Sequence, residues 1–182
     1  MRHADSWRQK LALTNMEILI PGLALVALMV YVSTRIKRSA AKAFDEEIVE
    51  SDEFTITKPA GFIMPVGAKE QAFVAYSKEF GTDKADSVRQ VTAELRIHAQ
   101  SLEEVCESIV AAASKVVSEQ HLANRSMILE TENIGNGIAL ETEYSLIEKN
   151  GKVFELSVAA LPETKEEQQR SIDALLASFE VK

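Results

Sequence analysis

The sequence contains little cysteine, histidine, proline or glycine. Its 182 residues include one cysteine and three histidines, which excludes an internal disulfide framework and a cysteine-only zinc site. Four prolines and seven glycines are too few for a collagen-like or low-complexity chain. Apolar residues make up 46% and charged residues 26% of the chain. This composition is typical of a protein that folds around a hydrophobic core rather than of a disordered one.

Positive charge is also scarce, except at the N-terminus. The chain carries 20 basic and 28 acidic residues, a net charge of −8. Residues 1–42 hold seven of the basic and two of the acidic residues, a net charge of +5, so residues 43–182 carry −13. Nucleic-acid binding needs clustered cations. The sequence therefore predicts no nucleic-acid partner for the larger, acidic part.

An apolar run interrupts the basic N-terminal segment. The 15 residues from Ile18 to Val32 carry no charge, and an extension back to Leu11 gives 22 residues that include Asn15 and Glu17. A membrane-spanning helix needs roughly 20 apolar residues. The run is therefore predicted to span a lipid bilayer, provided that Glu17 lies near one interface, where its carboxylate reaches headgroup water.

This membrane anchor is predicted to be uncleaved. A cleaved signal peptide is the alternative, but no small-x-small cleavage site precedes the basic residues that follow Val32. A buried core helix is a further alternative, which the flanking positive charges argue against. These charges are nearly equal on the two sides, so they leave the orientation open. The side chains that we expect to form the anchor are Ile18, Leu19, Ile20, Leu23, Leu25, Val26, Leu28, Met29, Val30 and Tyr31.

The chain is predicted to have four parts. Residues 1–10 form an N-terminal tail, and residues 11–43 form the transmembrane helix and its extension beyond the membrane. Residues 44–53 form an acidic linker without periodicity, and residues 54–182 form a soluble domain. In this domain, alternation of apolar and polar residues predicts strands over residues 54–57, 72–76, 88–98, 127–132, 138–148 and 152–160.

Two helices are predicted among these strands. Ser101 and Glu104 have the spacing of a capping box, and the apolar stripe behind them predicts a helix that ends near residues 118–122. A last helix starts at Pro162, where Thr164 and Glu167 form a second capping box. The fold class is therefore α+β, with one N-terminal transmembrane helix followed by an antiparallel sheet with two packed helices.

Four short segments of the soluble part resemble the PsbP/Mog1-like α/β/α family. They are the opening strand and turn FTITKPAGF at 54–62, the helix start SLEE at 101–104, the hairpin NGKVFEL at 150–156 and the terminal helix IDALLASF at 172–179. The resemblance implies a PsbP/Mog1-like domain over residues 54–182. It also implies a non-enzymatic accessory role on a larger membrane protein complex, of energy-transducing or photosynthetic type, with the domain on the extracytoplasmic side.

The sequence predicts no catalytic, cofactor or metal site, and hence no enzyme. Cys106 lies on an apolar helix stripe, where cysteine usually acts as a small hydrophobic residue rather than as a nucleophile. His98 and His121 lack the spacing of a metal site. Four glutamates alternate along neighbouring strands, which indicates a solvated sheet face or, alternatively, an oxygen-lined cation site. They are Glu130, Glu132, Glu141 and Glu143.

Two functions are compatible with these features. The first is a single-pass membrane-anchored subunit whose domain docks on a larger membrane protein complex, where confinement to the bilayer raises its effective concentration. The second is a carrier or sensor of a small apolar ligand at the membrane surface. The second function predicts a cleft lined by aromatic residues that otherwise form part of the core, namely Phe62, Phe73, Tyr76 and Phe154.

Overall fold

The computed structural model describes residues 4–65, 67, 71–135 and 137–182, with side chains from residue 21 onward apart from those of residues 40 and 135. The chain divides into two compact units, Met1–Lys42 and Ala43–Lys182. The first unit is a single helix, α1 (Ala4–Lys42), with Pro21 inside it. Helix α1 takes in most of the predicted tail, because no proline or glycine stands before Pro21 to stop it.

The described part of α1 exposes its apolar side chains. Among the residues that the structure describes, no helix combines the length and the apolarity needed to cross a membrane. The side chains of Ile18, Leu19 and Ile20 lie outside the described part. The other predicted anchor residues are all exposed, namely Leu23, Leu25, Val26, Leu28, Met29, Val30 and Tyr31.

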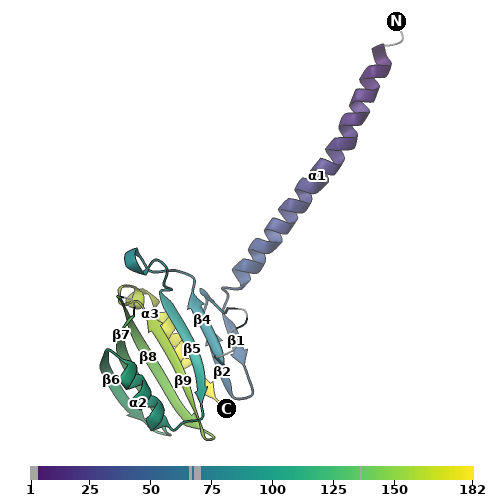
Figure 1. Ribbon diagram of the computed structural model, residues 1–182. Coiled ribbons are helices and arrows are strands. Elements are labelled where there is room, and N and C mark those ends of the chain that lie inside the picture. The colour runs from purple at the N-terminus through teal and green to yellow at the C-terminus, as the bar shows by residue number, and fades with distance from the viewer. Residues whose placement is uncertain (1–3, 66, 68–70, 136) are drawn as a thin grey trace. The chain divides into compact units, whose positions relative to one another are not determined.

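The second unit contains two antiparallel sheets (Figure 1). The small sheet has the order β1-β2-β10, and the large sheet has the order β3-β4-β5-β9-β8-β7-β6. The small sheet comprises β1 (Glu47–Glu50), β2 (Phe54–Lys58) and β10 (Glu180–Val181). The large sheet comprises β3 (Phe62–Ile63), β4 (Phe73–Ser77), β5 (Val91–His98), β6 (Lys115–Leu122), β7 (Ser126–Gly135), β8 (Ile138–Lys149) and β9 (Lys152–Ala160).

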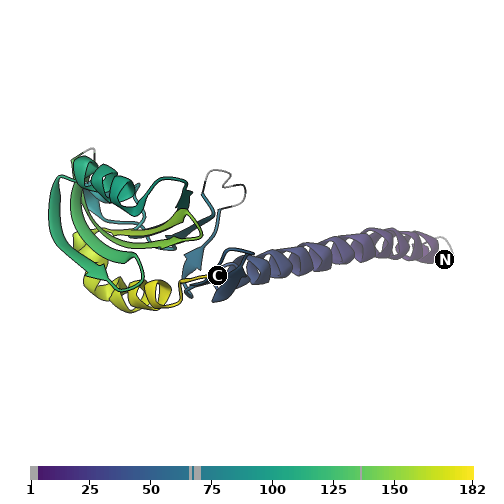
Figure 2. The same ribbon diagram turned by 90° about the horizontal axis from the view of Figure 1, so that it is seen from below.

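Two helices cover opposite faces of the large sheet. Helix α2 (Leu102–Ala112) lies on one face and α3 (Pro162–Ala177) lies on the other, as Figure 2 shows. A single 3-10 turn, η1 (Asp83–Ala85), is described in the connection between β4 and β5. The α+β prediction is therefore confirmed for the strands and the two helices. The single predicted sheet is wrong, because β2 pairs with β1 and β10 instead of joining the large sheet.

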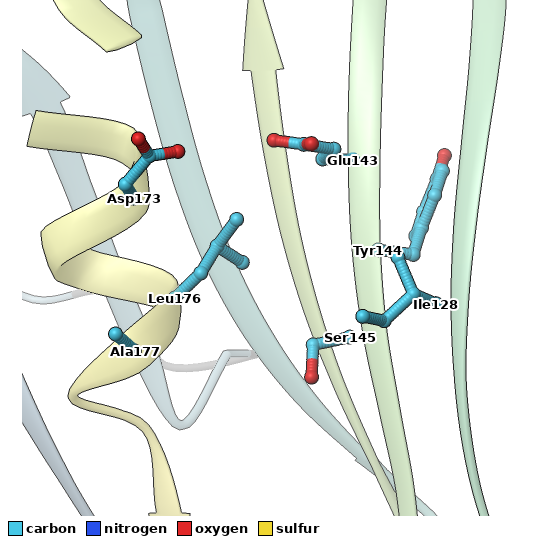
Figure 3. A pocket seen from close by; sticks show the side chains of 7 residues that line it. All are labelled: Ile128, Glu143, Tyr144, Ser145, Asp173, Leu176 and Ala177. Carbon is cyan, nitrogen blue, oxygen red and sulfur yellow. The ribbon is translucent and has the colours of Figure 1, made fainter. Parts of the chain in front are cut away.

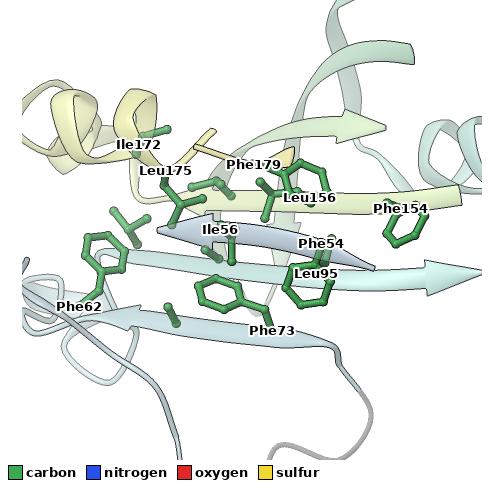
Figure 4. Packing of buried hydrophobic residues seen from close by; sticks show 14 of the residues in the cluster. Phe54, Ile56, Phe62, Phe73, Leu95, Phe154, Leu156, Ile172, Leu175 and Phe179 are labelled. Carbon is green, nitrogen blue, oxygen red and sulfur yellow. The ribbon is translucent and has the colours of Figure 1, made fainter. Parts of the chain in front are cut away.

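The main core lies between the large sheet, the small sheet and α3 (Figure 4). Ile56 of β2 and Leu175 of α3 meet the inward residues of β5 and β9, and burial of this apolar surface is the main stabilising force. A smaller cluster beneath α2 joins Leu102 and Val105 to Met127 of β7 and Leu146 of β8. The large sheet thus has an apolar layer on each face, which is why both helices pack against it.

A buried lysine holds the start of the second unit. Lys58, at the end of β2, is only 1% exposed. Its ammonium donates hydrogen bonds to the backbone carbonyls of Phe62 (3.0 Å), Ala43 (3.3 Å) and Asp45. Three carbonyl acceptors compensate for the removal of this charge from water.

The first predicted helix ends earlier than we expected. Helix α2 stops at Ala112, and the backbone of Ala113 is already extended. Residues 115–122, predicted to complete the helix, instead form β6, which pairs with β7. Val116 and Val117 continue the helical 3/4 spacing, but β-branched residues also favour strands. The strand forms instead of the helix because pairing with the free edge of β7 satisfies the backbone hydrogen-bonding groups of both strands.

Two smaller expectations also need correction. The predicted linker contains β1, because Val49 pairs with Ile56 of β2 and packs against the core despite its acidic neighbours. The second capping box does not form. Helix α3 starts at Pro162, whose fixed φ suits the first helical position, while Thr164 is buried within the helix and its hydroxyl donates to the carbonyl of Leu161 (3.2 Å).

Candidate functional site

A cavity lies between α3 and the adjoining strands β7 and β8. Its volume is about 330 Å³. Figure 3 shows the carboxyl groups of Glu143 and Asp173 facing each other across it, with Leu176 below them. The lining combines three apolar residues with two acids and two hydroxyl-bearing residues, and consists of Ile128, Glu143, Tyr144, Ser145, Asp173, Leu176 and Ala177.

The alternation of β8 places Glu143 in this cavity. Residues 141, 143 and 145 share the face toward α3, whereas Leu146 points to the opposite face and packs under α2. On α3, Leu176 and Ala177 follow Asp173 by three and four residues, so all three lie on one side of the helix. The cavity therefore forms where α3 packs against the face of β8 that carries Glu141, Glu143 and Ser145.

Glu143 is an electrostatically perturbed residue of the cavity. Its Oε2 atom is fully buried, and a side-chain hydrogen bond links its carboxyl to that of Glu130 on the neighbouring strand. Burial raises the pKa of the Glu143 carboxyl above its ordinary value of 4.5. The ammonium of Lys165 opposes this shift, while the negative charge of Glu130, the hydrogen bond to Glu130 and the charge of Asp173 increase it. The carboxyl is therefore solvated poorly and surrounded mainly by like charge.

The single nearby ammonium is already engaged. Lys165 of α3 forms an ion pair with Glu141 (2.9 Å). Burial alone would lower the pKa of Lys165, but its hydrogen bond to Glu141 and the negative charges of Glu141, Glu143 and Glu130 outweigh burial and raise that pKa. Lys165 is therefore a cation at neutral pH that neutralises mainly Glu141, which leaves Glu143 without a direct positive partner.

The four alternating glutamates do share a face, as predicted. Glu130 pairs across the strands with Glu143, and Glu132 pairs with Glu141. This face is not simply solvated, because α3 covers part of it and Lys115 bonds Glu132 (2.7 Å). Within the described residues, no group of three His, Cys, Asp or Glu side chains is arranged to hold a metal ion.

A second candidate surface is the free edge of the large sheet at β6. All eight of its residues are exposed, and its Val116, Val117 and Leu122 are among the exposed large hydrophobic residues of the protein. The register with β7 shifts between Val116 and Ser118, so Val117 has no partner in β7. This irregularity is a β-bulge, a common feature of edge strands.

Cys106 and His121 lie beside β6, in an open hollow of about 230 Å³ that they share with Met127 and three glutamates. Cys106 is half-buried, and its thiol approaches the Met127 sulfur at 4.0 Å. Burial raises the pKa of the Cys106 thiol, and the charges of Glu119 and Glu107 raise it further. A thiol held protonated in this way is a poor nucleophile.

His98 and His121 bind different partners. His98 of β5 pairs with the buried Glu155 of β9 (2.8 Å). His121, which we expected at a helix end, stands in β6 and pairs with Glu119 (3.0 Å). Each histidine is therefore held by a different carboxylate, on a different part of the sheet.

Among the described residues, three of the four aromatic residues that the second function would place in a cleft belong to the core instead. Phe62, Phe73 and Phe154 are buried in the main core, where they pack with residues of β2, β5 and α3. Their side chains fill the space that a ligand cleft would need, because protein interiors are close-packed. A cavity lies instead between α3 and β7–β8, and the sequence had placed Asp173 and Leu176 in the last helix without indicating a site there.

Comparison with solved structures identifies the fold. No protein-family model matches the sequence, and no curated protein matches it. LpqN of Mycobacterium tuberculosis, involved in cell envelope biogenesis, aligns over 76% of this chain and 91% of its own with a TM-score of 0.52 and 10% identity. Cyanobacterial PsbP (CyanoP) of Synechocystis sp. PCC 6803 aligns over 76% and 94% with a TM-score of 0.51 and 11% identity. The chain has a PsbP/Mog1-like fold.

A third similar structure is a Mog1 protein. The Ran-binding protein Mog1p of Saccharomyces cerevisiae aligns over 76% of this chain and 96% of its own, with a TM-score of 0.50 and 13% identity. Similarity at such low identity establishes the fold alone. The function of the PsbP/Mog1-like domain in this chain therefore has to be argued from its own surfaces.

Proposed function

We propose that this protein is a non-enzymatic accessory module that binds a partner protein through the edge strand β6 and is held at a membrane by α1. The observation that carries the proposal is the β6 edge. Exposed edge strands present unpaired backbone groups that can pair with a strand of another chain. The opposite edge of the large sheet is only the two-residue β3, so β6 is the longer of its two edges.

The side chains of β6 support this role. Natural proteins usually protect long edges with charges, proline or covering segments. The bulge at Val117 protects β6 only in part, because Val117 and Leu122 remain 50% and 43% exposed. Strand addition at this edge would cover them.

The partner segment is expected to be extended and basic. Residues 43–182 carry a net charge of −13. Beside β6, the carboxylates of Glu103 and Glu107 from α2 and Glu119 from β6 border one hollow. Complementary charge speeds association and selects among partners. A segment that alternates apolar residues with lysine or arginine therefore fits both the edge and its surroundings.

The membrane part of the proposal rests on the sequence of α1. The uncharged run Ile18–Val32 lies between basic segments, and the run lengthens to 22 residues when it is counted from Leu11. Large apolar side chains on this helix, such as Leu25 and Leu28, are exposed. Lipid would cover them, and the flanking basic residues would meet the headgroups. We place the domain on the extracytoplasmic side, as the resemblance implies.

Two of the similar structures are consistent with a binding role. Mog1p is described as a Ran-binding protein, so this fold can present a protein-binding surface. LpqN is involved in cell envelope biogenesis, a process located at the cell surface. From the resemblance of the sequence to the PsbP/Mog1-like family, we propose that the partner of this chain is part of a larger membrane protein complex, of energy-transducing or photosynthetic type.

Site-specific photo-crosslinking tests the partner site. A benzoylphenylalanine residue is placed at position 117 of the full-length protein in its native membrane, and adducts are identified by mass spectrometry. The matched control carries the probe at position 48, because Ile48 is 68% exposed on β1, an edge of the small sheet. We expect an adduct with a different protein from position 117 and none from position 48.

A second variant tests whether the edge is required. Val117→Lys combined with Leu122→Lys places two charges on the edge and leaves the core intact, because both side chains are exposed. We expect this variant to fold with an unchanged melting temperature and to lose the partner. Retention of the partner, a self-adduct as the sole product at position 117, or equal adducts at both positions would contradict the proposal.

A further inference from the structure

We propose that residues 43–50 form a latch, a segment that docks on the second unit and opens without unfolding of the main core. The latch follows α1 directly and contains β1. Most of its residues are exposed, including Ile48 at 68%, yet the segment is docked through an antiparallel pair with β2. Segments that bury little apolar surface are the ones that open locally in folded proteins.

Lys58 supplies charged hydrogen bonds that hold the latch closed. Its ammonium donates to the carbonyls of Ala43 (3.3 Å) and Asp45, which belong to the latch, and to the carbonyl of Phe62 (3.0 Å), which does not. The side chain is 1% exposed. Hydrogen bonds from a charged donor are stronger than neutral ones, above all away from water. Lys58 therefore contributes strongly to the closed state.

Phe44 and Val49 complete the docking of the latch. The Gly61 amide donates to the Phe44 carbonyl (2.7 Å), and the Lys78 ammonium lies 5.8 Å from the centre of the Phe44 ring, within the range of a cation–π interaction. Val49 is partly buried and packs against the main core. This small apolar contact adds little hydrophobic stabilisation, so the closed state depends mainly on its polar contacts.

Strand β2 keeps its other contacts when the latch opens. On the side away from β1 it pairs with β10, where Thr55 lies opposite Glu180. Phe54 and Ile56 of β2 are buried in the main core. None of these contacts involves residues 43–50, so opening removes β1 alone from the small sheet. The eight detached residues can then extend over about 26–29 Å.

Opening of the latch changes the reach of the domain. In the closed state the chain between α1 and β2 is folded back on the second unit, whereas in the open state it is a flexible tether. A longer tether brings the β6 edge to partner segments over a wider range of distances from the membrane. This consequence rests on the proposed function, whereas the latch itself does not.

Hydrogen exchange at residue resolution tests the latch in the full-length protein in nanodiscs, without any partner. The reporter is the Gly61 amide, which loses its acceptor, the Phe44 carbonyl, when the latch opens. The reference amides are those of β5 and β9, which are interior strands of the large sheet. We expect Gly61 to exchange at least about tenfold faster than the reference amides, because its opening is local.

Two variants weaken the closed state by different contacts. Lys58→Met keeps an unbranched side chain but removes the donors, and we expect it to raise Gly61 exchange at least about tenfold further. Val49→Ala leaves Lys58 intact and removes part of the apolar contact of the latch. It should raise Gly61 exchange in the same direction, which keeps the test available if Lys58→Met does not fold.

Ile172→Val is the matched control, because Ile172 of α3 lies in the main core and keeps its packing when the latch opens. This variant should raise exchange of the reference amides, which exchange by global unfolding, and leave Gly61 unchanged. Three results would overturn the proposal. They are Gly61 exchange as slow as that of the core in the wild type, unchanged Gly61 exchange in both latch variants, or equal increases at Gly61 and the reference amides in Ile172→Val.

Discussion

At the scale of single residues, Glu143 illustrates how tertiary structure changes the meaning of a surface-like side chain. In the sequence it is one of four alternating glutamates. In the folded protein α3 approaches this face and brings Asp173 close to Glu143, while Glu130 lies directly opposite on β7. Glu143 therefore lies in an environment that opposes its ionised form. Such environments are more typical of functional sites than of ordinary surfaces.

The raised pKa of Glu143 has a consequence for stability. Between the ordinary value of 4.5 and the raised pKa in the folded state, the native protein binds more protons than the unfolded chain does. The stability that Glu143 contributes is therefore complete below pH 4.5 and is lost as the pH rises through the folded pKa. Glu143→Gln, which cannot ionise, should raise the melting temperature at pH 7 by about 1–3 °C, after allowance for solvent screening.

The same variant should behave like the wild type near pH 4, where both side chains are neutral. Thermal unfolding of the full-length protein at pH 4 and pH 7 provides the measurement. Glu166→Gln on the exposed side of α3 is the control, and we expect no comparable difference between its two pH values. A lower melting temperature for Glu143→Gln at pH 7 would contradict the assigned electrostatics.

Residue-level prediction from the sequence succeeded where a local pattern was sufficient. The capping box of α2 is confirmed, because the Glu104 amide donates to Ser101 Oγ (3.3 Å) and the Ser101 amide donates to Glu104 Oε2 (3.0 Å). The burial of Lys58 was not predictable in this way. Its acceptors belong to residues 43, 45 and 62, and only the folded chain brings them to one ammonium group.

At the scale of elements, the β8–β9 hairpin is the feature that the sequence predicted most closely. Lys149 pairs with Lys152, and the two residues between them both have positive φ, 55° for Asn150 and 72° for Gly151. Asn-Gly is favoured in such two-residue turns because both residues tolerate this conformation. Strand β9 was predicted with its observed bounds, Lys152–Ala160.

Gly151→Val should therefore destabilise the domain. A β-branched side chain at positive φ costs about 1–3 kcal/mol, and β8 and β9 are both interior strands of the large sheet. Urea unfolding of the full-length protein measures this cost. Lys152→Val, one residue further along in an ordinary strand position, is the control and should change stability little. Equal unfolding midpoints for Gly151→Val and wild type would contradict a role of this positive-φ turn in stability.

The boundary between α2 and β6 was not predictable from local pattern. Residues 115–122 satisfy a helical spacing, but Val116 and Val117 are also strand formers. Pairing with the edge of β7 along residues Lys115–Leu122 selects the strand over the helix. The proposed partner site was missed for the same reason, because a segment assigned to a helix has no free strand edge.

At the scale of the whole molecule, the two units differ in charge and in the surfaces that they expose. Residues 1–42 are basic and contain the apolar run of α1, whereas residues 43–182 are acidic and contain the PsbP/Mog1-like fold. The proposed function assigns attachment to the first unit and recognition to the second. This division makes the two roles separable by mutation.

Leu25→Arg or Leu28→Arg should release the full-length protein from the membrane or prevent its insertion. An arginine at the centre of a bilayer-spanning helix costs roughly 2.5–3.5 kcal/mol. Membrane fractionation followed by carbonate extraction provides the measurement. Leu25→Phe keeps the position apolar and is the control, which should remain in the membrane pellet. Full retention of the arginine variants in the pellet would contradict the anchor.

The sequence by itself was sufficient for the α+β class, for most strands of the large sheet and for the hairpin and the α2 cap. These features depend on the alternation, spacing and turn chemistry of neighbouring residues. The tertiary structure alone decided that β6 is a strand with a free edge, that the aromatic residues fill the core, and that a cavity opens beneath α3. Each depends on groups distant in the sequence that compete for the same space or the same hydrogen bonds. A pattern of neighbouring residues does not reveal which of these distant groups come into contact.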